Sequence, residues 1–290
     1  MKLRQSLTGW LFMIPFLIVV IAFLIAPLGY ALYLSTQADT LVGGQEFVGI
    51  ENYKFSLTDP IFIEGVKRVF IFGLIQIPIM LFLSTVGALV IDVINTRLSR
   101  MFRLIAFMPY AVPGVVAALM WGFLYSESFG PFVGIAESLG AKDFNFFSLK
   151  VFIYSISNIV TWAWTGYNMI IIYSALQGLS REVYEAAIVD GATQVQIAIR
   201  VKIPAIKNAI LLTTIFAIIG TMQIFTEPRI LARYTNAVNN GYTPNIYSFN
   251  LAFAQSQFNY AAAVSFTLAI VVFVVTAIVL GLTRRKGRVE

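Results

Sequence analysis

The sequence predicts an all-α membrane protein that crosses the bilayer with six transmembrane helices and forms a single domain over residues 1–290. Three observations lead to this fold class. Hydrophobic residues make up 59% of the chain and charged residues only 12%, whereas about a quarter of the residues in a soluble domain are charged. Six stretches are apolar over the roughly 20 residues that a helix needs to cross a hydrocarbon core of about 30 Å. Basic residues gather in the segments between these stretches, where they orient a membrane protein.

The six expected spans leave little sequence between them: 9–34, 69–94, 104–126, 151–178, 206–226 and 261–282. The first span could imitate a secretory signal peptide. Its charge-free stretch from Trp10 to Leu34 is too long for the apolar core of such a peptide, and it lacks a clear small-x-small cleavage site. We therefore interpret it as a retained membrane anchor.

The second and third spans contain three prolines, Pro78, Pro109 and Pro113. A proline removes a backbone hydrogen bond and kinks a helix, and membrane bundles tolerate such kinks when neighbours satisfy the freed groups. The prolines either shape these helices passively or serve as a hinge for a moving helix. The sequence leaves both interpretations open.

Most of the 20 Lys and Arg residues lie at the two termini and in the loops 95–103 and 179–205. The positive-inside rule places these four segments, and therefore both termini, in the cytoplasm. Lys67 and Arg68 lie on the opposite side and run against the rule. Orientation in the membrane explains the net charge of +6, so lipid is an expected partner and nucleic acid is not.

Residues 179–205, between the fourth and fifth spans, form the longest cytoplasmic loop. Ser180 is a good N-cap, and Glu185 places negative charge near the N-terminus of the helix that would follow. Residues 184–188 favour a helix, and Gly191 then permits a turn that a residue with a β-carbon would resist. The first half of the loop therefore predicts a short helix that ends in a turn.

The second half of this loop carries two periodicities. Val195, Ile199 and Ile203 recur at a helical spacing of four residues, but the same run also alternates apolar and polar residues as a strand does. We favour a helix-turn-helix, because an isolated strand would leave its backbone groups unpaired beside the membrane. Pro204 then leads into the fifth span.

The composition also argues against several kinds of chemistry. The chain has no Cys and no His, so it lacks a thiolate nucleophile and the commonest metal ligand, and we expect no catalytic residues and no metal site. The interiors of the six expected spans are free of charged residues, which argues against proton or ion coupling. No G-x-x-x-x-G-K-[ST] loop is present to bind ATP. Energy for active transport would have to come from another protein.

One pattern in the 179–205 loop is specific. Glu185, Ala186 and Ala187 are followed by Gly191 four residues later and by an Ile-Pro pair at 203–204. This pattern resembles the EAA loop of permease subunits in binding-protein-dependent ABC importers. The loop would then be the cytoplasmic coupling loop between the fourth and fifth helices of such a permease.

Further stretches resemble the sugar-importer branch of that family, so the likeness covers nearly the whole chain. They are FVGIENYKFSLTDPIF (47–62), MPYAVPGVVAALMW (108–121), WTGYNM (164–169), FTEP (225–228) and FNYAAAVS (258–265). The N-terminal span and the segment after it resemble the first permease of the usual pair, as in importers of the maltose and glycerol-3-phosphate type. Two features depart from the family: Ser180 stands where Pro is common, and the external loop 233–244 is not glycine-rich.

The resemblance implies a transport subunit rather than an enzyme, in a bacterial or archaeal cytoplasmic (inner) membrane. In that family the EAA helix docks on a cytoplasmic ATPase, and two ATPases drive two permeases between outward-facing and inward-facing states. The implied partners are a second permease, two ATPases that bind ATP and Mg²⁺, and an extracytoplasmic solute-binding protein; the chain itself would hold no cofactor. The residues implied to couple to the ATPase are Tyr184, Glu185, Ala186, Ala187, Asp190 and Gly191.

The resemblance also directs attention to polar and aromatic residues at membrane depth. A sugar stacks its C–H faces on aromatic rings and needs amides and hydroxyls for its OH groups. The residues expected along the solute path are Gln76, Asn158, Trp162, Trp164, Tyr167, Asn168 and Gln223. The amides could instead make helix-helix hydrogen bonds, and the tryptophans could face the membrane interface. Another polar solute such as glycerol-3-phosphate, or a secondary transporter, remains an alternative.

Overall fold

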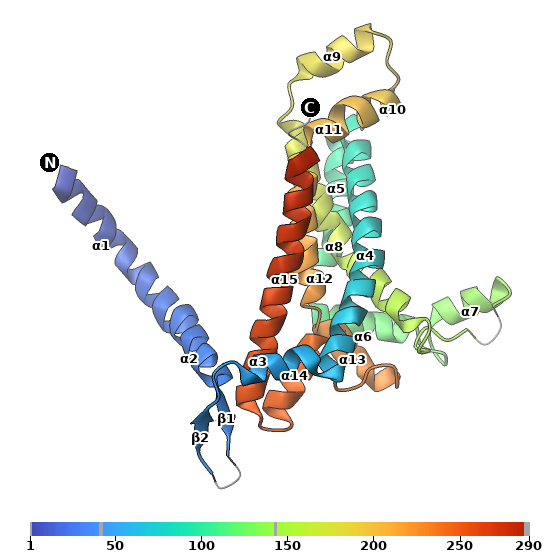
Figure 1. Cartoon of the computed structure of the whole chain (residues 1–290). Coiled ribbons are helices and arrows are strands. Elements are labelled where there is room, and N and C mark those ends of the chain that lie inside the picture. The colour runs from blue at the N-terminus through green and yellow to red at the C-terminus, as the bar shows by residue number, and fades with distance from the viewer. Residues whose placement is uncertain (1, 41–42, 95, 142–143, 287–290) are drawn as a thin grey trace. The chain divides into compact units, whose positions relative to one another are not determined.

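The structure, a computed structural model, describes residues 2–40, 43–94, 96–141 and 144–286, and these are mostly helical (Figure 1). Its contacts divide the chain into two compact units. Unit 1 comprises Met1–Ile63 and Pro244–Val271, and unit 2 comprises Glu64–Thr243 and Val272–Glu290. The expectation of a single domain over the whole chain stays a prediction.

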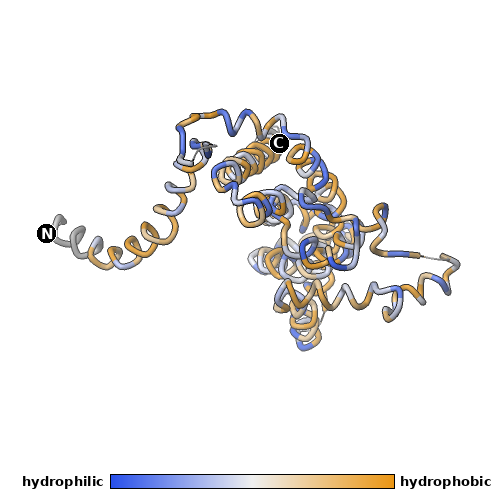
Figure 2. The backbone as a smooth tube through the Cα atoms, turned by 90° about the horizontal axis from the view of Figure 1, so that it is seen from below, coloured by the Kyte–Doolittle hydropathy of each residue, from blue (hydrophilic) through white to orange (hydrophobic). Residues whose placement is uncertain are grey.

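Unit 1 begins with a continuous helix and continues through a small hairpin. Its elements are α1 (Lys2–Val20), the π-helical turn η1 (Ile21–Ile25), α2 (Ala26–Ser35), β1 (Gln37–Asp39), β2 (Gln45–Phe47), α3 (Glu51–Thr58), α14 (Pro244–Phe253) and the first part of α15 (Phe258–Lys286). Figure 2 shows hydrophobic residues along most of the N-terminal helix. Strands β1 and β2 pair antiparallel.

A buried carboxylate organises the rest of unit 1. Asp59 is 5% exposed and accepts hydrogen bonds from the hydroxyls of Tyr247 at 2.6 Å and Tyr260 at 2.7 Å. Its Oδ1 also accepts from the amide of Ile61 at 2.9 Å, which caps the start of the next helix. Burial raises the pKa of Asp59, but these hydrogen bonds outweigh burial and hold the pKa below its ordinary value.

Unit 2 contains most of the long helices, and Figure 1 shows α4, α5, α8 and α12 running side by side. Its elements are α4 (Pro60–Val93), which starts at the edge of unit 1, α5 (Thr96–Ala111), α6 (Gly114–Leu124), α7 (Pro131–Ser138), α8 (Phe152–Gln177), α9 (Arg181–Val189), α10 (Gln194–Ile197), η2 (Ala198–Lys202), α11 (Ile203–Ala205), α12 (Lys207–Met222), α13 (Thr226–Leu231) and η3 (Ala232–Tyr234). The last part of α15 also belongs to this unit.

The core of unit 2 is built where α8 meets its neighbours. One buried cluster joins Ala88 and Ile91 of α4, Ile172 and Leu176 of α8, and Ile206 before α12. Helix α5 packs on the other part of α8 so closely that a β-carbon on Gly166 would overlap the carbonyl of Ala106. Small and aliphatic side chains therefore let these helices approach one another.

Among the described residues, four helices are long and apolar enough to cross a membrane: Trp10–Ser35, Pro60–Val93, Lys207–Tyr234 and Phe258–Thr283. A fifth is possible if α5 and α6 count as one span, although they meet at a bend of 94°. The expected span 104–126 is therefore broken between α5 and α6, and the number of six spans stays a prediction. Pro113 lacks an amide hydrogen and disfavours helical backbone at the preceding residue, so the helix breaks there.

The expected spans differ from the structure in two further ways. Helix α4 begins at Pro60 rather than at 69, so Lys67 and Arg68 lie inside it. Helix α8 covers nearly all of the expected span 151–178, but it does not qualify as an apolar crossing helix. Much of α8 is buried inside unit 2, including polar side chains such as Ser155 and Asn168, so its composition is more polar than that of a lipid-facing helix.

Candidate functional site

A cavity of about 220 Å³ lies between helices of unit 2. Helices α4 and α8 form one part of its wall, and α12, α13 and the segment between them form the other. The lining residues that the argument uses are Gln76, Trp164, Tyr167, Asn168, Gln223 and Glu227. The first five were predicted from the sequence as solute-path residues.

Two of the predicted residues do not line this cavity. Asn158 donates from Nδ2 to the hydroxyl of Tyr125 at 2.8 Å, and the ring of Trp162 meets Trp121 edge-on at 5.7 Å. The helical period explains their position. At 100° per residue, positions 158 and 162 lie on the face of α8 opposite to that of Trp164 and Tyr167.

The buried amides of the cavity are only weakly engaged. Gln76 is 1% exposed; its Oε1 accepts from the hydroxyl of Thr221 at 3.2 Å, and its Nε2 faces the sulfur of Met80 at 3.3 Å. Asn168 is 4% exposed, and its Nδ2 donates to the carbonyl of Trp164 at 2.9 Å and faces the same sulfur at 3.5 Å. Sulfur is a weak acceptor, so these amide groups retain the capacity to donate to a polar solute.

Aromatic rings stiffen one side of the cavity. Tyr110, at the end of α5, stacks on Tyr167 with ring centroids 4.6 Å apart and meets Trp164 edge-on at 5.2 Å. Trp164 is 41% exposed in this chain. A ring held by two neighbours offers a fixed apolar face next to the amides, a combination typical of small-molecule sites.

Glu227 is the functional candidate that sequence reasoning missed. It lies one residue beyond the expected end of the fifth span at 226, whereas the apolar helical region of the structure continues from Lys207 to Tyr234. Because Glu227 lies outside the expected span, the expectation that the span interiors are free of charge stays a prediction. The FTEP stretch at 225–228, which resembles the sugar-importer branch of permeases, was the available signal.

The electrostatics of the cavity follow from this carboxyl group. Glu227 is the one acidic residue among the described lining residues, and none of them is Lys or Arg. Its Oε1 lies 3.9 Å from where a β-carbon on Gly114 would stand, next to the break between α5 and α6. The cavity of this chain therefore presents amides, hydroxyls, aromatic rings and one carboxyl group, but no cation.

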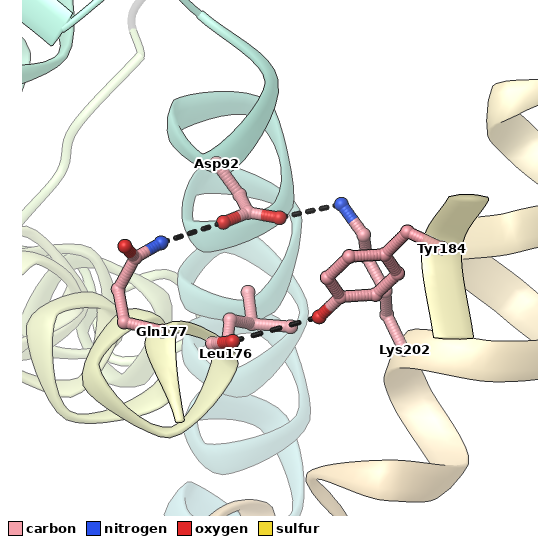
Figure 3. A network of polar contacts seen from close by, with 5 residues as sticks. All are labelled: Asp92, Leu176, Gln177, Tyr184 and Lys202. Atoms are coloured by element: carbon pink, nitrogen blue, oxygen red, sulfur yellow. Dashed lines mark hydrogen bonds and ion pairs between the residues drawn. The ribbon is translucent and has the colours of Figure 1, made fainter. Parts of the chain in front are cut away.

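A second polar site, which we call the junction, lies where the 179–205 loop meets the ends of α4 and α8 (Figure 3). Lys202 and Asp92 form an ion pair with 2.5 Å between Nζ and Oδ2, and their side chains are 9% and 10% exposed. Gln177 donates to the other oxygen of Asp92 at 2.8 Å. Tyr184 of α9 covers the ammonium group with its ring, 4.8 Å from the centroid. Sequence reasoning did not identify the junction.

The predicted coupling residues occupy the exposed arm of unit 2. Glu185, Asp190 and Gly191 are exposed, as is Ala186, whereas Ala187 is half-buried. Gly191 has φ of +76°, a left-handed conformation that favours glycine. The Ser180 hydroxyl accepts from the amide of residue 182 and caps α9.

Tyr184 differs from the other coupling residues because it points toward the junction. Its hydroxyl donates to the carbonyl of Leu176 at 3.5 Å, a long contact, and the side chain is half-buried. Burial raises the pKa of Tyr184, and the charge of Asp92 raises it further. Its hydroxyl is therefore neutral at physiological pH.

Comparison with known proteins decides the family. Residues 84–288 match the model of the family described as binding-protein-dependent transport system inner membrane component. The chain belongs to this family. It is therefore a permease of the inner membrane and belongs to a transport family rather than to a family of enzymes.

Relatives and solved structures of this permease extend over almost its whole length. It is 30% identical over 286 residues to the lactose transport system permease protein LacF of Rhizobium radiobacter, covering 95% of this chain and 94% of that one. It is 27% identical to the sn-glycerol-3-phosphate transport system permease protein UgpA of Pectobacterium atrosepticum, covering 98% and 96%. A chain in the crystal structure of a bacterial alginate ABC transporter with a pentasaccharide-bound periplasmic protein shares its fold, with a TM-score of 0.85 at 18% identity over 98% of this permease and 96% of that chain.

Proposed function

We propose that this permease forms half of the alternating-access path of an ATP-driven ABC importer for a neutral sugar or oligosaccharide. The observation that carries the proposal is the cavity, in which donors from Gln76 and Asn168 lie beside the rigid aromatic group of Tyr110, Trp164 and Tyr167. Relatives named for lactose, diacetylchitobiose and arabinooligosaccharides support a carbohydrate solute. Sugars match such a lining because they present hydroxyl groups at their edges and C–H groups on their faces.

Six membrane spans fit this function. Helix α8 has 26 residues, which at 1.5 Å per residue gives about 39 Å, long enough to cross. Its polar side chains would be sheltered by protein, which membrane helices tolerate. The bent pair of α5 and α6 would supply the third crossing. Both termini and the segment with α9 and α10 would lie in the cytoplasm, as the distribution of basic residues favours.

The partners follow from the coupling helix α9. We propose that α9, the turn at Gly191 and α10 form the coupling loop, and that α9 docks on one of two cytoplasmic ATPases that bind ATP and Mg²⁺. A second permease would complete the path, and an extracytoplasmic binding protein would deliver the solute. Glu185, Ala186, Asp190 and Gly191 are exposed and free to face the ATPase.

Glycerol-3-phosphate is the less favoured solute. A phosphate group needs compensating cations or clustered amide donors, whereas this cavity offers the carboxyl group of Glu227 and no lining Lys or Arg among the described residues. A secondary transporter is disfavoured because the chain belongs to a family of binding-protein-dependent permeases.

The orientation can be tested with a single cysteine, because the natural chain contains none. A Cys at Ala192, beside the coupling turn, should react with a membrane-impermeant thiol reagent only after the cytoplasmic membrane is opened. A Cys at Ala38, on the other side of the first span, should react in intact cells whose outer access is confirmed. Labelling of Ala192→Cys in intact cells would overturn the orientation.

The cavity can be tested with substitutions that separate solute contact from helix packing. Asn168→Ala and Trp164→Ala should each lower transport roughly 5- to 30-fold while the complex assembles normally, because each removes a polar or stacking contact worth roughly 1–2 kcal/mol. Uptake by cells and the yield of purified complex measure the two effects. Lower yield and thermal stability instead would assign the side chains to helix packing.

The solute itself can be identified by mass spectrometry of whatever the co-purified binding protein retains. We expect a neutral sugar or oligosaccharide. If the retained solute is an anion, the absence of Lys and Arg from the described cavity lining no longer supports a neutral sugar.

A further inference from the structure

The junction connects three separate segments through one carboxylate. Asp92 stands at the C-terminal end of α4, and each of its oxygens accepts from a different segment: Oδ2 from Lys202 in η2 and Oδ1 from Gln177 at the end of α8 (Figure 3). Asp92 and Lys202 are 110 residues apart in the sequence. The π-helical turn η2 ends at Lys202, and such widened turns are frequent at functional sites.

The proposed coupling helix α9 reaches the junction through the side chain of Tyr184. Tyr184 places its ring over the ammonium group of Lys202 and its hydroxyl toward the carbonyl of Leu176. Its neighbour Glu185 is exposed. One face of α9 is therefore open to a partner, while Tyr184 ties α9 to the ends of the long helices.

From the junction, α4 and α8 stay in contact down to the cavity. The buried cluster of Ala88, Ile91, Ile172 and Leu176 follows directly. Next, Gly87 lies against Met169, so closely that a β-carbon there would come within 2.9 Å of the sulfur.

The contact continues to the cavity wall. Ser84 donates to the carbonyl of Thr165 at 2.9 Å, and the sulfur of Met80 faces the amides of Gln76 and Asn168. Every step is a direct contact between α4 and α8 or within α4. A series of direct contacts between α4 and α8 thus runs from the junction to the cavity.

We propose that the ion pair of Asp92 and Lys202 is the joint through which α9 moves α4 and α8 as one body, so that Asp92, Lys202 and Tyr184 are positioning residues for transport. The proposal rests on the proposed docking of an ATPase on α9. Both charges are sheltered from water, so the pair holds its geometry far better than an exposed pair does. A displacement of α9 is therefore transmitted to the cavity wall instead of being absorbed by the loop.

The test uses a reporter cysteine in the cavity, which requires no knowledge of the solute. Ala217 lines the cavity, and Ala217→Cys in the Cys-free chain gives a reference complex. With partner thiols blocked, its reaction rate with a maleimide is measured with and without ATP, alongside ATP hydrolysis. We expect the rate of the reference complex to change with ATP as the path switches between its two states.

The deciding variant is the double substitution Asp92→Asn with Lys202→Met. It removes both charges at nearly constant volume, so no lone charge is left buried and the fold should be preserved. We expect hydrolysis to persist while the ATP-dependent change in labelling falls roughly 2- to 30-fold, the range of known coupling effects. If the thermal stability of the double variant stays near that of the reference complex, unfolding does not explain the smaller change in labelling.

A second variant covers the case in which the double substitution fails to fold. Tyr184→Leu removes the ring over Lys202 and should also reduce the ATP-dependent change, whereas Tyr184→Phe keeps the ring and should reduce it less. The matched control neutralises the exposed ion pair of Glu51 and Lys54, whose side chains are 65% and 62% exposed. Glu51→Gln with Lys54→Met should leave the labelling change intact.

Two results would count against the joint. A full labelling change in the folded double variant, or equal effects of Tyr184→Leu and Tyr184→Phe, would overturn it. If the reference complex itself shows no ATP-dependent change, the proposed function fails as well. If Gly191→Val abolishes the change while the double variant retains it, coupling through α9 stands and only the joint is wrong.

Discussion

Gly166→Ala should prevent the permease from assembling. Gly166 is buried in α8 where α5 crosses it, and an added β-carbon would overlap the carbonyl oxygen and carbon of Ala106. Those atoms belong to the backbone of α5, so no side-chain rotation can relieve the overlap. Overpacking typically costs about 1–3 kcal/mol, and a clash with a helix backbone should reach or exceed the upper value.

The measurement is the yield and thermal stability of the purified complex, and both should fall strongly. Gly281→Ala is the matched control, because a β-carbon at Gly281 in α15 meets nothing within 4 Å. Alanine is also the better helix former, so this control should match or slightly exceed the stability of the natural chain. Equal stability of Gly166→Ala and Gly281→Ala would show that α5 and α8 are not packed as described.

The second large effect concerns the turn after α9. Gly191 has φ of +76°, and a β-carbon there would meet nothing within 4 Å, so its requirement for glycine lies in the backbone alone. Gly191→Val should strain the turn by about 1–3 kcal/mol, which corresponds to a loss of roughly 5- to 150-fold in the docking-competent conformation. Gly191→Asn should lose less of the docking-competent conformation than Gly191→Val, because asparagine tolerates the left-handed backbone conformation.

Glu185→Lys should disturb the same interaction by a different route. Its side chain is exposed in the middle of α9, and a lysine there would present a positive charge to the proposed ATPase in place of a negative one. Both Gly191→Val and Glu185→Lys should lower the amount of ATPase that co-purifies, or uncouple its hydrolysis from transport, while the membrane helices still insert. Natural levels of ATPase and of stimulated hydrolysis in both variants would show that α9 is not the coupling helix.

Local signals in the sequence predicted much of this arrangement. Hydropathy predicted continuous helices at five of the expected positions, although α4 begins nine residues earlier than expected. The pattern from Glu185 to Gly191 led, by resemblance, to the coupling loop that we propose. The amides Gln76 and Asn168 were recognisable because a polar side chain in an apolar run needs a reason. These features depend on neighbouring residues alone.

The features that the sequence did not predict depend on packing between segments that are distant in the chain. Nothing near Asp92 or Lys202 in the sequence indicates that they pair, because the contact exists only after α4, α8 and η2 come together. The prolines predicted a kink or a hinge in the third span, but not a break at Pro113 with an angle of 94° between α5 and α6. Asn158 and Trp162 are of the residue types that a solute path needs, but they lie on the face of α8 opposite to that of Trp164 and Tyr167.

The central claim, that a neutral sugar enters by a path driven from a partner ATPase, is tested most directly by uptake into vesicles. The complete complex would be reconstituted with its ATPases facing the lumen, its binding protein outside, and the sugar that this protein retains as the labelled solute. The account predicts that sugar accumulates in the lumen only when ATP is enclosed there, and that an ionophore has no effect. Accumulation that proceeds without ATP and collapses with an ionophore would contradict it.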